Sequence, residues 1–344
     1  MNRRSRSTAL LATAIAGLFA AAPALAKGGD DTGGYLQAKG VVASNGIAGG
    51  GRGGPAALQI ASQSGDAVLV ALPTDDGTAL ARANPSGGAV RSVSIDGGFT
   101  IPTVALDKST SGLSADDRML VLAQPLVQFP QRRTRFEILD ARSLRVRDDI
   151  VLPGTYSFDA ISPDGGLLYL IQYTSPSDPS RYLVRAYNVS SRHLLRAPVV
   201  DPSESGRPMT GKPVTRAISP DGRWAYTLYQ GSDEGPFVHA LDTTAHRAVC
   251  VDLDAIDLPK NLSGSKLAVS DGGGELSILR GGSEVGRVDT QTFTVSSAES
   301  TGAGGGQGAT GPPWPLIVAI GVGMLALAGL VSRTLHRRRR LASS

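Results

Sequence analysis

The residue types that could carry out catalysis or hold a metal are few and widely spaced in this chain. No two histidines have the spacing of metal ligands, and a single cysteine, Cys250, cannot build a zinc site. The sequence contains neither the Gly-x-Ser-x-Gly pattern of a nucleophile elbow nor the Gly-x-x-x-x-Gly-Lys-Ser/Thr pattern of a phosphate-binding loop. The four histidines are His193, His239, His246 and His336. We therefore assign no catalytic, cofactor-binding or metal-ligating residue and expect no cofactor.

Three candidates for chemistry are better explained as structural residues. Cys250 alternates with apolar residues in a predicted strand, so we interpret it as a small buried apolar group; a reactive thiol would need a cationic neighbour. His239 lies in a similar alternating stretch, Phe237 to Leu241, and we interpret it as a structural residue that either faces the surface or is hydrogen-bonded. The acidic stretch 252–257 could gather a cation, but it lacks the ligand spacing and the central glycine of a calcium loop.

Many of the remaining carboxylates fall in a turn that recurs along the chain. In the stretch 217–228, Pro220 fixes φ at the first corner, Asp221 can bond its own backbone, and Gly222 accepts a positive φ, so a tight turn between two strands is predicted. Degraded copies of this pattern recur, and their aligned serines are spaced 52, 48, 57 and 51 residues apart. These serines are Ser62, Ser114, Ser162, Ser219 and Ser270.

A second turn follows each copy after an apolar strand and confirms the register of the repeat. It begins at Asn84, Asp140, Asn188, Asp242 and Asp289. A period of about 50 residues with about four short strands is typical of β-propeller blades. We predict an all-β fold of five four-stranded blades; six is the alternative, in which residues 35–54 supply further strands. The predicted blades cover 55–95, 101–152 and 156–200, and after a connector at 201–211 two more blades end near 297.

The two recurring turns and their spacing resemble the repeat of secreted bacterial β-propellers of the YVTN and TolB-like (WD40-like) type. Their repeats run from Ser-Pro-Asp-Gly through an apolar strand to an apolar residue followed by Asp. The resemblance covers residues 55–297 and implies a propeller ectodomain. It implies nothing about the ligand.

Both ends of the chain carry the pattern of an exported, membrane-anchored protein. Residues 1–26 combine arginines, an apolar run and a small-x-small site, which is the pattern of a signal peptide. The uncharged apolar run within 314–332 is long enough for a transmembrane helix, and the basic tail 333–344 would stay in the cytoplasm. We expect a single-pass type I protein of the cell membrane with its ectodomain outside the cytoplasm. The remaining segments are a flexible leader at 27–54, in which a strand at Tyr35 to Val42 could instead pair with the last blade, and a Gly-rich linker at 298–313.

The basic balance of the chain does not indicate nucleic acid binding. The formal net charge is +4, but eight basic residues lie in the two terminal segments, beside the apolar runs. Without them, 26 basic residues face 30 acidic ones. The membrane therefore explains the basic residues, and we expect no nucleic acid partner.

The architecture favours a binding or scaffold module for a protein or a cell-envelope glycan. The alternative is a propeller-based hydrolase or lyase with a site at the mouth of the central channel. A carboxylate–histidine pair or two carboxylates at that mouth would favour the enzyme. The basic cluster 131–135 could contact an anion or a surface polymer, although such clusters at hairpin tips are usually solvated.

Overall fold

The structure is a computed structural model that describes residues 57–204, 210–231 and 235–298. These residues all belong to one of the two compact units of the chain. They form strands, turns and one short 3₁₀ helix, η2 (Pro202–Glu204), and contain no helix long and apolar enough to cross a membrane. The expected signal peptide, leader, transmembrane helix and basic tail lie outside the described residues, as does the Gly-rich linker apart from Ala298.

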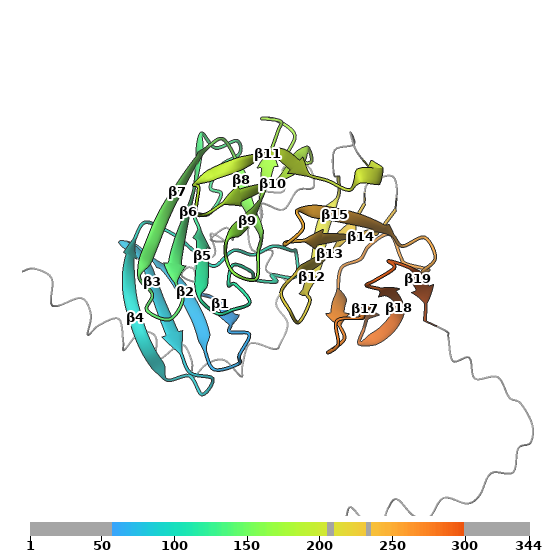
Figure 1. Cartoon of the computed structure of the whole chain (residues 1–344), viewed down its shortest axis with the longest axis horizontal. Coiled ribbons are helices and arrows are strands. Elements are labelled where there is room, and N and C mark those ends of the chain that lie inside the picture. The colour runs from blue at the N-terminus through green and yellow to red at the C-terminus, as the bar shows by residue number, and fades with distance from the viewer. Residues whose placement is uncertain (1–56, 205–209, 232–234, 299–344) are drawn as a thin grey trace, which may run out of the picture. The chain divides into compact units, whose positions relative to one another are not determined.

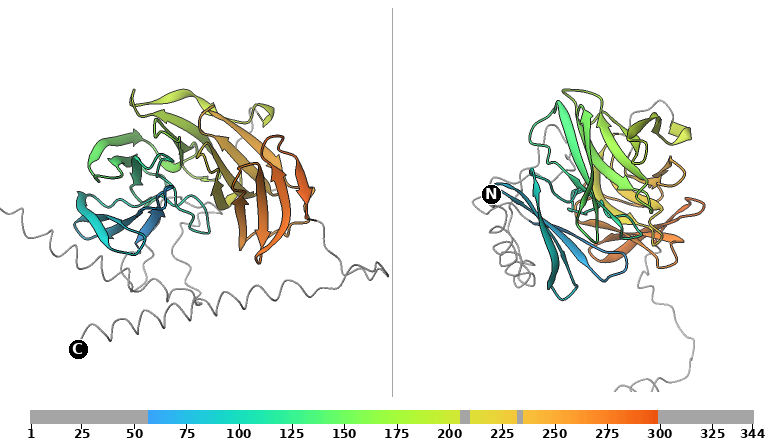
Figure 2. Two further views of the ribbon diagram at one scale, coloured as in Figure 1. Left: turned by 60° about the horizontal axis from the view of Figure 1, so that its bottom comes forward. Right: turned by 60° about the vertical axis from the view of Figure 1, so that its left-hand side comes forward.

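The strands of the described residues form five antiparallel sheets, and in each sheet the strands follow one another in chain order (Figures 1 and 2). The first sheet contains β1 (Leu58–Ala61), β2 (Val68–Thr74), β3 (Gly77–Ala83) and β4 (Ala89–Asp96). The second contains β5 (Met119–Ala123), β6 (Arg133–Asp140) and β7 (Val146–Pro153), and the third β8 (Tyr156–Ile161), β9 (Leu167–Tyr173), β10 (Tyr182–Asn188) and β11 (His193–Val199). The fourth contains β12 (Lys212–Ile218), β13 (Trp224–Gln230), β14 (Phe237–Asp242) and β15 (Arg247–Asp252), and the fifth β16 (Ser265–Val269), β17 (Glu275–Arg280), β18 (Ser283–Asp289) and β19 (Val295–Ser297).

The turn that contains the recurring serine has the predicted form; it follows the first strand of four sheets and precedes β5 in the second sheet. In the fourth sheet, the Ser219 hydroxyl donates to Asp221 (2.5 Å) and accepts the backbone N–H of Trp224 (2.8 Å), while Gly222 has φ +71°. The same bond from the fifth residue after the serine to its Oγ is present in all five sheets. Because every bond in this turn joins residues at most five positions apart, the turn is specified by its local sequence.

The second recurring turn is also confirmed. The Asp242 carboxylate accepts the backbone N–H groups of Thr244 and Ala245, and Asp140 and Asp289 do the same in their own sheets. In the fourth sheet this turn places a non-glycine residue, His246, at φ +55°. The sequence does not indicate this strained position, because glycine is the residue that usually occupies it.

The prediction of four strands per blade is wrong for the second sheet, which has three. The chain before β5 makes isolated bridges instead of a ladder: Thr100 with Ala123 and Leu113 with Leu120. Pro102 lacks the N–H that a ladder would need, and Gly112, at φ +113°, breaks the extended backbone. Residues 100–113, which we call the central segment, are therefore free to make other contacts.

Apolar clusters join each sheet to the next one in the chain. Separate clusters of buried side chains span the first and second sheets, the second and third, the third and fourth, and the fourth and fifth. Phe99, Phe136, Phe158 and Tyr169 are among the largest fully buried side chains in these clusters. Consecutive sheets packed face to face through apolar cores, each a meander of neighbouring strands, form a propeller-like assembly of five blades in the described residues.

Candidate functional site

The central segment joins blades that are far apart in the sequence. The backbone N–H groups of Leu106 and Asp107 donate to the carbonyl oxygens of Pro213 (2.9 Å) and Val214 (3.1 Å) in β12 of the fourth blade. At its other end, the Thr110 hydroxyl donates to the Gln59 carbonyl in β1 (2.9 Å). The segment thus connects the first strands of the first and fourth blades, where a fourth strand of the second blade was predicted.

Asp107 anchors the central segment to the fourth and fifth blades. Its Oδ2 accepts hydrogen bonds from the Thr215 hydroxyl (2.7 Å) and from Lys266 Nζ (2.6 Å). Burial would raise the pKa of Asp107, but the bonds from Lys266, Ser109 and Thr215 outweigh it and hold the pKa below its ordinary value. The carboxylate therefore stays charged at neutral pH and keeps both partners.

The turns that contain the recurring serines meet one another. Asp117 Oδ1 and Oδ2 accept the backbone N–H groups of Gln63 (2.7 Å) and Ser64 (2.9 Å), which joins the second blade to the first. The Gln63 side chain donates from Nε2 to the Pro220 carbonyl in the fourth blade (3.1 Å). The Asp116 N–H donates to the Pro163 carbonyl in the third blade (3.2 Å). The rim formed by these turns is therefore held by hydrogen bonds between four blades.

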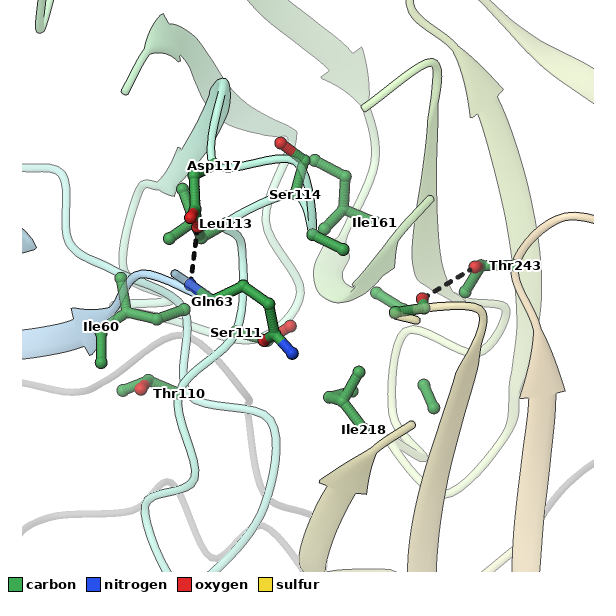
Figure 3. Close-up of a pocket in the computed structure, with 15 residues that line it drawn as sticks. Ile60, Gln63, Thr110, Ser111, Leu113, Ser114, Asp117, Ile161, Ile218 and Thr243 are labelled. Atoms are coloured by element: carbon green, nitrogen blue, oxygen red, sulfur yellow. Dashed lines mark hydrogen bonds between the residues drawn. The ribbon is translucent and has the colours of Figure 1, made fainter. Parts of the chain in front are cut away.

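These turns and the central segment enclose a cavity of about 210 Å³, which we call the axial pocket (Figure 3). Ile60 lies across the pocket from Ile218 and Thr243 (Figure 3). Its apolar lining residues are Ile60, Ala61, Leu113, Ala115, Ala160, Ile161, Ile218, Gly222 and Ala225, and its polar ones are Gln63, Thr110, Ser111, Ser114, Asp117 and Thr243. A pocket whose lining comes from four blades, and which combines apolar side chains with polar groups from three of them, is suited to bind a ligand.

The axial pocket offers hydrogen bonds and apolar contact but no acid–base pair. Among the described residues that line it, Asp117 is the only titratable side chain, and both its oxygens already accept backbone N–H groups. The carboxylate–histidine pair or carboxylate pair that would favour an enzyme is not found among these lining residues. The pocket therefore offers a ligand van der Waals contact and neutral hydrogen bonds.

The predicted structural residues His239 and Cys250 lie in a polar layer between the third and fourth blades. Arg216, Thr227, His239 and Cys250 are direct cross-strand partners and form one row across the fourth blade. The guanidinium of Arg216 pairs with Asp159 of the third blade, and both side chains are 3% exposed. Asp159, His239 and the Arg216 side chain are buried between the blades, and no residue of the layer lines the axial pocket.

Burial in this layer shifts the pKa values of both His239 and Cys250. His239 is 2% exposed, and burial lowers its pKa to about 4, so the imidazole is neutral at pH 7. Cys250 is partly buried, and burial, reinforced by the Asp201 charge, raises the pKa of its thiol to about 12. A neutral thiol in this position is not a nucleophile, which agrees with the structural interpretation.

The remaining sequence candidates lie apart from the axial pocket. In the basic cluster, Arg135 pairs with Asp149 (3.0 Å) and lies over the Phe99 ring, while Arg132 and Arg133 are exposed. His193 begins β11, His246 lies in a turn of the fourth blade, and His336 is outside the described residues. No group of three or more His, Cys, Asp or Glu residues in the described ranges could hold a metal ion, and this includes the acidic stretch 252–257.

Sequence reasoning missed Asp117 and the central segment. The signal for Asp117 is present, because it stands where the other four copies of the turn have glycine, and it adopts φ +57°. An aspartate at this position of the turn indicates that its side chain makes a contact outside the turn. The contacts of the central segment have no such signal, since they join residues about 100 positions apart.

Comparison with known proteins gives similarity at the level of structure. No protein-family model matches the sequence, and no curated protein matches it. The chain is similar to the structure of a functionally unknown protein from Desulfotomaculum acetoxidans (14% identity, TM-score 0.45), with 72% of this chain and 70% of that chain covered. It is also similar to TolB from Acinetobacter baumannii (11% identity, TM-score 0.40; 70% and 53% covered) and to the β-propeller domain of Cps50 (Swd1) from Myceliophteria thermophila (8% identity, TM-score 0.41; 70% and 73% covered).

Proposed function

We propose that this chain is a membrane-anchored, extracytoplasmic β-propeller of the secreted YVTN and TolB-like type that binds a protein or cell-envelope ligand at its axial pocket. The observation that carries the proposal is the composition of the pocket: four blades contribute to it, and its one titratable side chain is engaged in bonds between blades. A cavity of about 210 Å³ is below the usual size of a site for a free small molecule, so it fits one projecting group of a larger partner.

The rim of the pocket supports binding because it is already organised. The bonds from Gln63 and Ser64 to Asp117 and from Gln63 to Pro220 join three blades before any ligand arrives. A preorganised site loses less conformational entropy on binding than a flexible one does. Ile218, a large apolar side chain that is 43% exposed in the pocket, is the residue that a partner would cover first.

The proposed location places this rim outside the cytoplasm. The signal peptide at 1–26 would direct export, and the apolar segment at 314–332 would hold the chain in the membrane through the linker at 298–313. Protease added to intact cells should remove the region 27–313 and spare an epitope placed after Ser344. An ectodomain protected from the protease would contradict this topology.

The binding site can be tested with two matched variants of the full chain. Ile218→Asp places a charge in the axial pocket, whereas Val90→Asp makes the same kind of change on β4, where Val90 is 63% exposed. The tagged chains are cross-linked in cell envelopes, and the partners that they retain are compared. We expect Ile218→Asp to lose the partners that the wild type and Val90→Asp both retain. Equal retention by all three would contradict the proposed site.

A further inference from the structure

A second cavity lies between the fourth and fifth blades and is separate from the axial pocket. It has a volume of about 270 Å³ and lies between the turn 219–226 and the turn 272–274. We call it the interblade groove. Its lining residues include Asp221, Trp224, Tyr226, Gly272, Gly274 and Gln291.

One wall of the interblade groove is aromatic. The rings of Trp224 and Tyr226 are nearly parallel, with 9° between their planes and 6.1 Å between their centroids. Phe293 meets the Trp224 ring edge-on with a centroid distance of 5.4 Å. Tyr226 is buried and Trp224 is partly exposed, so the indole carries the accessible apolar surface of this wall. The guanidinium groups of Arg223 and Arg247 also lie over the indole, 5.6 Å and 5.7 Å from the ring centroid. These neighbours fix its orientation before any ligand binds.

The charges around the groove are balanced. The guanidinium of Arg223 donates to Asp242 through Nε (3.1 Å) and Nη2 (2.6 Å), and Arg247 approaches the same carboxylate (3.6 Å). Burial would raise the pKa of Asp242, but the bonds from Arg223 and the turn outweigh it and hold the pKa well below its ordinary value. With the exposed carboxylate of Asp221 on the same wall, two cations face two anions. This balance disfavours a strongly charged ligand.

The two sides of the groove together leave donors and acceptors for a neutral polar ligand. The Oδ1 of Asp221 is engaged by Ser219 and by the N–H of Arg223, and no partner of its Oδ2 is found in the described part of the chain. The Gln291 side chain is exposed at the groove. Gly272 and Gly274 have no atom within 4 Å of the position that a Cβ would occupy, so the backbone itself borders open space.

We propose that the interblade groove binds a neutral saccharide ring. A sugar combines hydroxyl groups that both donate and accept with an apolar face of C–H groups. The groove supplies a carboxylate acceptor in Asp221, an amide in Gln291 and an aromatic surface in Trp224, without net charge. The inference goes beyond the function proposed above, because it concerns a second site, and it rests on that function only for the source of the ligand, an envelope glycan.

Tryptophan fluorescence offers a direct test, because the chain has two tryptophans. In the full chain with Trp314→Phe, which changes a residue outside the described ranges, Trp224 is the sole reporter. The protein is kept in a detergent without a sugar headgroup and titrated with D-glucose, D-galactose, D-mannose and N-acetyl-D-glucosamine. We expect at least one of these to change the fluorescence in a saturable way. Saturation by none of them, or by inorganic phosphate instead, would overturn the proposal.

A matched pair of glycine variants locates the site. Gly272→Val places a side chain in the groove, whereas Gly98→Val makes the same change at an exposed loop of the first blade; neither glycine has a positive φ or a nearby atom. We expect Gly272→Val to weaken saccharide binding at least about tenfold and Gly98→Val to leave it unchanged. Equal affinity in the two variants would overturn the assignment of the groove.

The two proposed sites can fail independently. If Ile218→Asp abolishes partner retention in envelopes but leaves the saccharide titration unchanged, both proposals stand. If the saccharide titration fails while Ile218→Asp still abolishes retention, the groove proposal is wrong and the axial site stands. If the titration of Trp224 fluorescence saturates and Gly272→Val weakens saccharide binding, but Ile218→Asp retains every partner, the axial site is wrong and the groove stands.

Discussion

Asp117 Oδ1 lies 2.7 Å from the backbone nitrogen of Gln63, so a side chain of the second blade bonds the first turn of the first blade. This bond explains why a non-glycine residue occupies φ +57° in the turn. Its energetic role can be separated from the backbone strain, because alanine and glycine both remove the carboxylate while only glycine relieves the strain.

We therefore expect the stability to fall in the order wild type, Asp117→Gly, Asp117→Ala. Loss of the two bonds to Gln63 and Ser64 should cost about 1–2 kcal/mol, and alanine should cost about 1 kcal/mol more than glycine because it keeps the left-handed strain. Urea denaturation of the three proteins measures these differences. A Gly variant more stable than the wild type would show that the bonds contribute nothing.

Gly222→Val should destabilise the protein by about 2–4 kcal/mol. Gly222 has φ +71°, and a Cβ there would lie 2.4 Å from the Cβ of Ala115 in the second blade. The variant therefore combines backbone strain with a clash between blades. Gly272→Val, at a glycine with neither feature, is the control and should leave the melting temperature nearly unchanged. Equal effects of the two substitutions would mean that the contact with Ala115 is absent.

The buried pair of Arg216 and Asp159 should be strongly coupled. Arg216→Met leaves the Asp159 carboxylate buried without its partner and should cost about 3–5 kcal/mol. The double variant Arg216→Met with Asp159→Leu removes both charges from the interface, so it should be more stable than either single variant. Denaturation of all four proteins gives the coupling free energy, and additive effects of the two single changes would argue against the pairing.

His239 should make the protein less stable in acid. Its folded pKa of about 4 lies below the ordinary value of 6.5, so the unfolded chain binds more protons between these pH values. The stabilisation is complete above pH 6.5 and is lost as the pH falls toward 4. Between pH 7 and pH 4.5 the wild type should lose about 2 kcal/mol more than His239→Phe, which cannot titrate. Parallel pH profiles of the two proteins would contradict the buried neutral state.

Glu137 should act in the opposite direction over much of the same pH range. Burial, and then the nearby charge of Asp149, raise its pKa from 4.5 to about 7, and its Oε2 is buried without a hydrogen-bond partner in the described residues. The folded state keeps this proton while the unfolded state releases it, so stability is lost as the pH rises from 4.5 through 7.

Glu137→Gln should therefore stabilise the protein by about 2 kcal/mol at pH 8 and have little effect at pH 5. Because the contributions of Glu137 and His239 oppose each other between pH 4.5 and 7, each must be measured against its own variant. A constant difference between Glu137→Gln and the wild type at both pH values would place the carboxyl in water.

Much of the blade organisation could be predicted because the signals for it are short-range. The turn at Ser219 closes on Trp224, five residues on, and the turn at Asp242 closes within three, so spacing and residue type were sufficient to find them. The structural interpretation of His239 followed from the alternation of its strand. The second blade broke the pattern at Pro102 and Gly112, where the same local rules already indicate that a regular ladder is interrupted.

The sequence by itself determined the repeat, its turns and the order of the blades, because these depend on hydrogen bonds between close neighbours and on the alternation of apolar residues. Only the tertiary structure decided which residues meet at the centre. The bond from Gln63 to Pro220 joins residues 157 positions apart, and that from Lys266 to Asp107 joins residues 159 positions apart. Such contacts follow from how the blades pack together, and no periodicity in a single chain encodes which turn will face which. The axial pocket and the interblade groove are products of that packing.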